Sequence, residues 1–338
     1  MGSLVITDRR RGDAKAQPAA EGILAACEAR MIASIAEGGT GPDARAAART
    51  VHSGGKRLRP RLLVASAGPA PRDPERLVHA AAAVELLHTA TLVHDDVIDG
   101  AEERRGEPTV AHRHGPAAAA RVGDLLLARA FAELARTGST EAVGVLARAA
   151  VELTRGEAGQ LAGAHDLDVG EDEYLERCRR KTSALFVAAC RIGALLGGAD
   201  GTTADRLASI AEQLGIAFQI LDDVLDITAP SEATGKPRGA DLRDGTVTLP
   251  LILAIRLEPG LRDEIARASS SEDVSGLCDR LADHPGTLLA REEGRRRLRL
   301  ARRTLDRLPP DVATGTIGSA VDRLDARLAA PAPRARAA

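Results

Sequence analysis

Two short acidic motifs contain the residues best suited to chemistry in this chain. Both follow the pattern D-D-x-x-D, and their acids are Asp95, Asp96 and Asp99 and then Asp222, Asp223 and Asp226. On a helix the first and last aspartates of a motif share a face, where like charges repel. Mg²⁺ would offset that cost, because it binds one or two carboxylates and completes its shell with phosphate oxygens and water. Solvated acidic faces are the alternative, but both motifs lie in highly apolar segments, so a site for metal and diphosphate is favoured.

Basic residues gather in settings that a polyanion could approach. Only four of the 46 basic residues are lysines, and three of these, Lys56, Lys181 and Lys236, follow a turn or open a helical pattern. A compact ammonium and a planar guanidinium are not interchangeable, so these lysines are candidate ligand contacts. In "GGKRLRP", Lys56, Arg57 and Arg59 place three cations within four residues, which suits a phosphate group. Taken alone, an ordinary basic loop remains the alternative.

Two arginines and a histidine flank the first acidic motif. Arg104 and Arg105 follow it in "ERRGEPT", and His88 lies seven residues before Asp95, two turns away on the same helix face. A lone histidine is more often structural, so the residues alone leave a ligand role and a structural role open for His88.

The elements that must position these residues are helices. Apolar residues recur at i, i+3, i+4 and i+7 over 75–99, 117–137 and 205–227, and Gly and Pro mark the breaks between such segments. Ala and Leu are abundant, whereas the chain has one Tyr, three Phe and no Trp, which favours helix over strand. We predict an all-α fold with one domain over 19–327 between flexible tails at 1–18 and 328–338.

The bulk composition excludes several classes of protein. A net charge of −2 gives no reason to expect nucleic acid or an acidic membrane as a partner. No apolar run of about 18 residues is present to span a membrane, and the polar N-terminus lacks a secretory signal. The four cysteines have no C-x-x-C spacing, and we expect them to be buried, reduced side chains that pack like small apolar residues. We expect a cytoplasmic protein without integral membrane contact.

These motifs together resemble one family, the trans-isoprenyl diphosphate synthases or polyprenyl synthetases, over about residues 20 to 325. The segments that resemble the family are 54–60, 85–109, 122–131, Gly156–Glu157 with Gln160, 180–186, 214–226 and 235–252. The resemblance implies an all-α helical bundle around a deep central cavity, usually in a homodimer. It implies Mg²⁺-dependent, head-to-tail transfer of an allylic prenyl chain onto isopentenyl diphosphate, giving a longer all-trans polyprenyl diphosphate.

The resemblance also assigns roles to residues. About three Mg²⁺ ions per active site would be bound by Asp95, Asp99 and Asp222. Asp96, Asp223 and Asp226 would assist in catalysis, together with Lys181 and Lys236. The allylic substrate would contact Arg104, Lys181, Thr182, Phe218, Gln219 and Lys236. Isopentenyl diphosphate would contact Lys56, Arg59, His88 and Arg105.

Two positions depart from the family pattern. Thr246 stands where many members have a lysine that would touch the allylic diphosphate, and Ala240 stands where Asn or another polar residue is common. Neither change removes a predicted metal ligand. A terpene cyclase, a head-to-head synthase and a non-catalytic partner subunit are the alternatives, and the two intact acidic motifs argue against all three.

Small residues before the first motif bear on product length. Ala90 and Thr91 lie five and four residues before Asp95, where short-chain members commonly have Tyr or Phe, and Leu87 lies a turn deeper. A helical turn of about 5.4 Å is close to the length of one isoprene unit. We therefore expect a product of about C30 to C50, with geranylgeranyl diphosphate (about C20) as the alternative, and a long product would be passed to the membrane.

Overall fold

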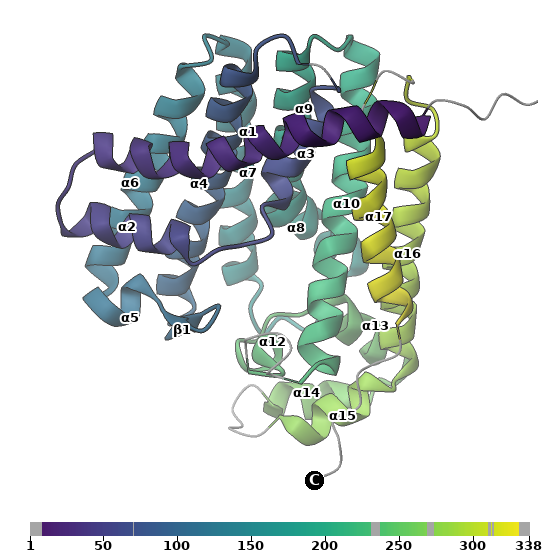
Figure 1. The fold of residues 1–338 in the computed structure, drawn as a ribbon. Helices are drawn as coiled ribbons and strands as arrows, with labels where there is room; N and C mark the ends of the chain where they lie inside the picture. The colour runs from purple at the N-terminus through teal and green to yellow at the C-terminus, as the bar shows by residue number, and fades with distance from the viewer. Residues whose placement is uncertain are drawn as a thin grey trace, which may run out of the picture. The chain divides into compact units, whose positions relative to one another are not determined.

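The computed structural model describes residues 9–69, 71–230, 237–268, 274–309, 312 and 314–330, with side chains from residue 20 onward. Nearly all of the secondary structure in these ranges is helical (Figure 1). The elements up to residue 135 are α1 (Arg9–Glu37), α2 (Pro42–His52), α3 (Leu58–Ser66), α4 (Pro74–Ile98), β1 (Glu103–Arg104), β2 (Glu107–Pro108), α5 (Val110–His114) and α6 (Pro116–Ala135). Those that follow are α7 (Thr140–Ala162), α8 (Glu171–Cys178), the π-helix η1 (Arg179–Ser183), α9 (Ala184–Gly197), α10 (Gly201–Thr228), α12 (Ala240–Arg243), α13 (Leu249–Leu257), α14 (Leu261–Ala268), α15 (Ser275–Ala282), α16 (Pro285–Leu305) and α17 (Thr314–Ala329).

The chain divides into two compact units, which are described separately. Unit 1 comprises Met1–Ala150, Leu185–Ile210 and Thr304–Ser319. Unit 2 comprises Val151–Ala184, Ala211–Arg303 and Ala320–Ala338. The first acidic motif belongs to unit 1 and the second to unit 2.

Helix α4 is the core helix of unit 1. It begins with Pro74 at its first turn, and the Asp73 side chain caps it by accepting a hydrogen bond from the Arg76 amide at 3.2 Å. It packs beside α6, α1 and α3 (Figure 1). Its four consecutive alanines at 80–83 are fully buried. Small side chains at such contacts let helix axes approach closely.

By length and composition, α4 is the one described helix that could cross a membrane, so the expectation that no such apolar stretch is present is wrong. Its most apolar window is 67% buried inside the protein, however. A helix that is apolar because it forms a core passes the same test, and the burial of α4 indicates that it is of this kind.

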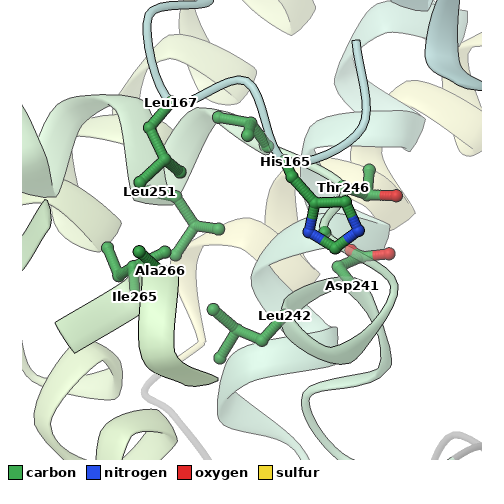
Figure 2. A pocket seen from close by; sticks show the side chains of 10 residues that line it. His165, Leu167, Asp241, Leu242, Thr246, Leu251, Ile265 and Ala266 are labelled. Atoms are coloured by element: carbon green, nitrogen blue, oxygen red, sulfur yellow. The ribbon is translucent and has the colours of Figure 1, made fainter. Parts of the chain in front are cut away.

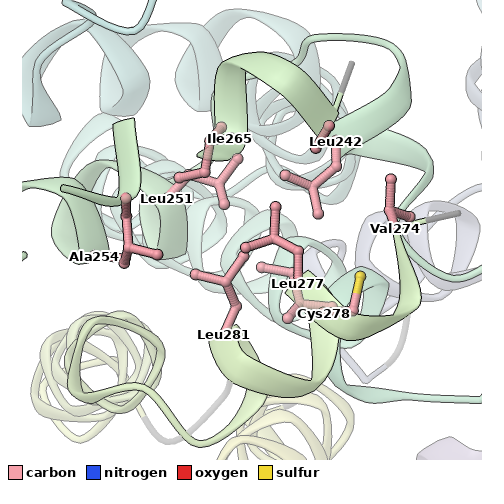
Figure 3. Close-up of a cluster of buried hydrophobic side chains, with 11 residues drawn as sticks. Leu242, Leu251, Ala254, Ile265, Val274, Leu277, Cys278 and Leu281 are labelled. Carbon is pink, nitrogen blue, oxygen red and sulfur yellow. The ribbon is translucent and has the colours of Figure 1, made fainter. Parts of the chain in front are cut away.

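Unit 2 is built on two clusters of buried side chains. One cluster places Tyr174 among apolar residues of α10, α13 and α16. The other joins the short helices α12 to α15, with Leu242, Leu251, Ile265, Leu277 and Leu281 at its centre (Figure 3). Together they fix the far end of α10, where the second acidic motif lies, against the loop that follows it.

The structure confirms the all-α fold. Helix α1 begins at Arg9, where Arg, Ala, Lys and Gln are good helix formers despite Gly12 and Pro18. Helix α17 continues to Ala329, and Leu328 in its last turn is 1% exposed. The bounds of the domain and its tails, the single domain and the central cavity stay predictions.

Candidate active site

The first acidic motif forms the C-terminal end of α4. Asp95 is half-buried, Asp96 is buried, and Asp99 is the exposed C-cap residue, whose amide donates to the Asp95 carbonyl at 2.8 Å. Arg104 Nε donates to Asp96 Oδ1 at 2.6 Å. The buried middle aspartate is thus bound by the protein itself, and its partner is an arginine that the family resemblance assigned to the substrate.

A small hairpin brings Arg104 back to α4. Strands β1 and β2 pair antiparallel, with Arg104 opposite Glu107. Arg105 and Gly106 form the turn with φ values of 59° and 77°, and two-residue hairpin turns require positive φ of this kind. The all-α prediction missed this hairpin because strands of two residues leave no periodicity to detect.

Five basic side chains of unit 1 lie near one another in what we call the cationic cluster: Arg57, Arg59, His88, Arg104 and Arg105. Burial lowers the pKa of His88 well below its ordinary value, and the positive charges of the four arginines lower it further, with Arg59 the strongest of them. Burial, opposed by Glu85 and reinforced by Arg105, lowers the pKa of Arg59 to about 10. Crowded, partly desolvated cations of this kind favour the binding of an anion.

The contacts of Arg59 and Arg105 point to the same conclusion. The Arg59 guanidinium lies over the Phe186 ring, 4.7 Å from its centroid, and its buried Nε has no hydrogen-bond partner among the described residues. Arg105 donates to the Gly54 carbonyl and packs on Gly55, where a Cβ would lie 3.0 Å from its Nη1. Gly54 and Gly55 have φ values of 84° and 150°, which favour glycine at both positions, and only at Gly55 would a side chain also meet the guanidinium.

Arg57 and Lys56, the other basic residues of the sequence GGKRLRP, differ in role. Arg57 takes a left-handed conformation, with φ of 48°, and donates to the buried Glu85 carboxylate at 2.9 Å and to the Val51 carbonyl at 2.7 Å. It anchors the loop, a role that sequence reasoning did not assign. Lys56 is exposed on the loop beside it.

The aspartates of the second acidic motif also differ in burial and in hydrogen bonding. Asp222 is exposed, whereas Asp223 is buried and accepts hydrogen bonds from the Tyr174 hydroxyl at 2.6 Å and from Gln219 Nε2 at 2.8 Å. Gln219 Oε1 in turn accepts from Thr182 Oγ1 at 2.6 Å. Burial raises the pKa of Asp223 to about 6 against the effect of its two donors.

Asp226 binds the loop that follows α10. Its two carboxylate oxygens accept from the amides of Ala240 at 3.1 Å and Asp241 at 3.2 Å, and its carbonyl accepts from the Gly239 amide at 2.9 Å. Ala240 takes part through its backbone only, so these contacts do not need the polar side chain that is common there. Through these hydrogen bonds Asp226 fixes the backbone of residues 239–241 against α10.

Lys181 and Thr182 lie on the π-helix η1, an irregular turn frequent at functional sites. Lys181 Nζ lies 2.7 Å from Glu157 Oε2. A Cβ added to Gly156 would lie 2.6 Å from the Lys181 amide nitrogen, so α7 and η1 touch through their backbones. Thr182 donates its single hydroxyl proton to Gln219 and is left with acceptor capacity only.

Comparison with known proteins identifies the family. The family model for polyprenyl synthetase matches residues 44–278. The chain belongs to the polyprenyl synthetase family. The predicted enzyme class, a trans-prenyltransferase, is thereby confirmed.

Three relatives of this polyprenyl synthetase bear on its activity. It is 40% identical to heptaprenyl diphosphate synthase component 2 of Geobacillus stearothermophilus, over 75% of this chain and 79% of that one. It is 41% identical to geranylgeranyl diphosphate synthase of Methanosarcina mazei, over 64% and 67%. The structure is similar to that of polyprenyl synthase from Caulobacter crescentus, complexed with calcium and isoprenyl diphosphate. That match has a TM-score of 0.83 and 32% identity and covers 98% of this chain and 100% of that one.

The carboxylates predicted to bind Mg²⁺ in this polyprenyl synthetase suit that ion. Asp99 and Asp222 are exposed and Asp95 is half-buried, and carboxylate oxygen is the donor that Mg²⁺ prefers. Within the described ranges, no three Asp, Glu, His or Cys side chains are grouped to hold a metal by themselves. Mg²⁺ takes few carboxylates and completes its shell with phosphate and water, so this donor set fits it.

The loop that carries Thr246 lines a small cavity of about 90 Å³ in unit 2 (Figure 2). His165, with φ of 66°, donates its amide to the Gly245 carbonyl at 2.8 Å, and its ring packs where a Cβ of Gly245 would be. The Thr246 amide donates to the Asp241 carbonyl at 2.8 Å. Nothing in the sequence indicated this role of His165. Lys236 lies outside the described residues.

The residues predicted to set product length differ in burial. Leu87 and Ala90 are 1% and 2% exposed, so both are packed. Thr91 is half-buried, and its hydroxyl donates to the His88 carbonyl at 2.8 Å. Thr91 is thus the more open of the two small positions, and it shares a helix face with Asp95. Phe218, predicted to contact the substrate, is half-buried on α10.

Proposed function

We propose that this polyprenyl synthetase extends an allylic diphosphate with isopentenyl diphosphate to an all-trans product of about C30 to C50. The observation that best supports this proposal is the cationic cluster beside the first acidic motif. Arg59 Nε is a buried donor without a described partner, and the neighbouring cations disfavour protonation of His88. A diphosphate would supply the missing acceptors and lower the repulsion among these groups.

The chemistry follows from charge. The allylic C–O bond breaks, the diphosphate leaves with the electron pair, and the double bond of isopentenyl diphosphate attacks the allylic carbon. A proton is then lost, and the released diphosphate is its acceptor. Lys181, Arg59 and Arg105 would bind diphosphates as fixed cations, and Mg²⁺ held by Asp95, Asp99 and Asp222 would neutralise the leaving group.

A shorter product is the second candidate. The 41% identity to a geranylgeranyl diphosphate synthase favours it, whereas the 40% identity to a heptaprenyl diphosphate synthase component supports the longer product. Small residues at Ala90 and Thr91 weigh towards the longer chain. Incubation with isopentenyl diphosphate, each allylic primer in turn and Mg²⁺, followed by sizing of the products, tests both proposals.

Assembly and location are also proposals. We propose a cytoplasmic homodimer that passes a long product to the membrane. The relative named as component 2 of a heptaprenyl synthase gives the alternative, a pair with a different subunit. Light scattering on the purified chain, together with its turnover, separates the two. An active species of about twice 35.2 kDa supports the homodimer, and an inactive chain rescued by a second subunit supports the alternative.

A further inference from the structure

The chain's only tyrosine links an apolar cluster to the second acidic motif. Tyr174 is 1% exposed within an apolar cluster of unit 2, and its hydroxyl donates to Asp223 Oδ2 at 2.6 Å. A buried tyrosine hydroxyl normally finds a partner. Here the partner is a carboxylate directly beside Asp222, the residue predicted to bind metal.

Donor and acceptor are fixed in each hydrogen bond around Asp223. An ionised carboxylate accepts and cannot donate, so Tyr174 and the amide nitrogen of Gln219 must both donate to it. The amide oxygen of Gln219 then faces Thr182, which must donate. We call these four side chains, Thr182, Gln219, Asp223 and Tyr174, the relay. It joins the π-helix η1 to α10 and to α8.

The relay fixes what its outer members can offer a ligand. Gln219 keeps one N–H donor, and Thr182 keeps acceptor capacity beside Lys181. Asp223 is turned into the protein, whereas Asp222, the next residue along the helix and about 100° around it, is exposed. Tyr174 is the one relay residue on α8, whereas the other three lie on η1 and α10. Its hydroxyl therefore connects this arrangement to a third helix.

We propose that Tyr174 is a positioning residue for the allylic substrate, acting through Asp223 and Gln219 on Thr182 and the π-helix. The proposal rests on the proposed function. Without the hydroxyl, Asp223 loses a charge-assisted donor while remaining buried, and it would turn to recruit another group. Gln219 and Thr182 would then lose their fixed orientation.

The test is Tyr174→Phe, which removes one oxygen atom and keeps the ring in the core. We expect kcat/KM for the allylic diphosphate to fall about tenfold or more, because a hydrogen bond to a charged group is lost. The KM for isopentenyl diphosphate should stay within about twofold, since the cationic cluster is untouched. An unchanged allylic kcat/KM in Tyr174→Phe, with the parent enzyme active, would overturn the proposal, whereas an inactive parent enzyme would overturn the proposed function instead.

Two further variants separate positioning from simple loss of core stability. Ile216→Val removes one methylene from the same buried cluster without touching the relay, and it should leave both KM values unchanged. In an Asp223→Asn background, Tyr174→Phe should add less than about a twofold loss, because the two residues act as one unit. A full tenfold loss in that background, or an allylic defect in Ile216→Val, would show that Tyr174 acts only through general packing.

Discussion

Arg104 Nε lies 2.6 Å from Asp96 Oδ1, so the middle aspartate of the first acidic motif is bound to an arginine eight residues further along the chain. The middle aspartate of the second motif, Asp223, is likewise bound by donors of the protein, Tyr174 and Gln219. Both motifs thus divide their acids in the same way. The middle residue holds the local structure, and the first residue is left at the surface or half-exposed.

This division predicts different outcomes for neighbouring substitutions. Asp95→Ala should reduce turnover by orders of magnitude and should lower the melting temperature less than Asp96→Asn does, because Asp95 is half-buried whereas Asp96 is buried. Asp96→Asn should lower stability by about 1.5–3 kcal/mol, since it weakens a buried, charge-assisted hydrogen bond to Arg104. Thermal denaturation and turnover of both variants check this. Equal melting temperatures for the two would contradict the division.

The neutral state of His88 predicts a pH dependence of stability. Its folded pKa lies well below the unfolded value of about 6.5, so the unfolded chain binds the proton more readily. The contribution of His88 is therefore complete above about pH 6.5 and is lost as the pH falls. Urea unfolding at pH 7.5 and pH 5.5 should show a smaller loss for His88→Asn than for the parent. The same loss in both proteins would mean that folding does not lower the pKa of His88.

The backbone contact between α7 and the π-helix predicts contrasting effects at two glycines of one helix. Gly156→Ala would place a Cβ 2.6 Å from the Lys181 amide nitrogen, so η1 must move. We expect lower stability and a raised KM for the allylic diphosphate. Gly159→Ala is the matched control, because its Cβ would meet nothing within 4 Å, and it should stabilise the helix by about 0.5–1 kcal/mol. Equal stability and equal KM for the allylic diphosphate in the two variants would contradict the backbone contact between α7 and η1.

Product length should respond to Thr91 more cleanly than to Ala90. Thr91 is half-buried, so Thr91→Phe can add bulk on the Asp95 face and should shorten the product towards C15 or about C20. Ala90→Phe would overpack a site that is 2% exposed, at a cost of about 1–3 kcal/mol. Chromatography of the products and a melting curve check the pair. A Thr91→Phe enzyme with the parent's product would place the floor of the chain-length path elsewhere.

Much of the fold and of the candidate site could be predicted from the sequence. Helical periodicity predicts α4 and α10, and the spacing of each acidic motif predicts which acids share a face. The pairings could not be predicted, because Tyr174 and Asp223 are 49 residues apart and no pattern in the sequence links them. Nor could the sequence show that Thr182 gives its only proton to Gln219, since that depends on side-chain rotamers fixed by packing.

The central claim is that this chain lengthens allylic diphosphates by a metal-dependent reaction. The most direct measurement is the chain length of the product that the purified protein makes from isopentenyl diphosphate and an allylic primer, with Mg²⁺ and again with a chelator. We predict a product of about C30 to C50 with Mg²⁺ and none with the chelator. A product no longer than the primer in the presence of Mg²⁺, or undiminished synthesis with the chelator, would contradict the account.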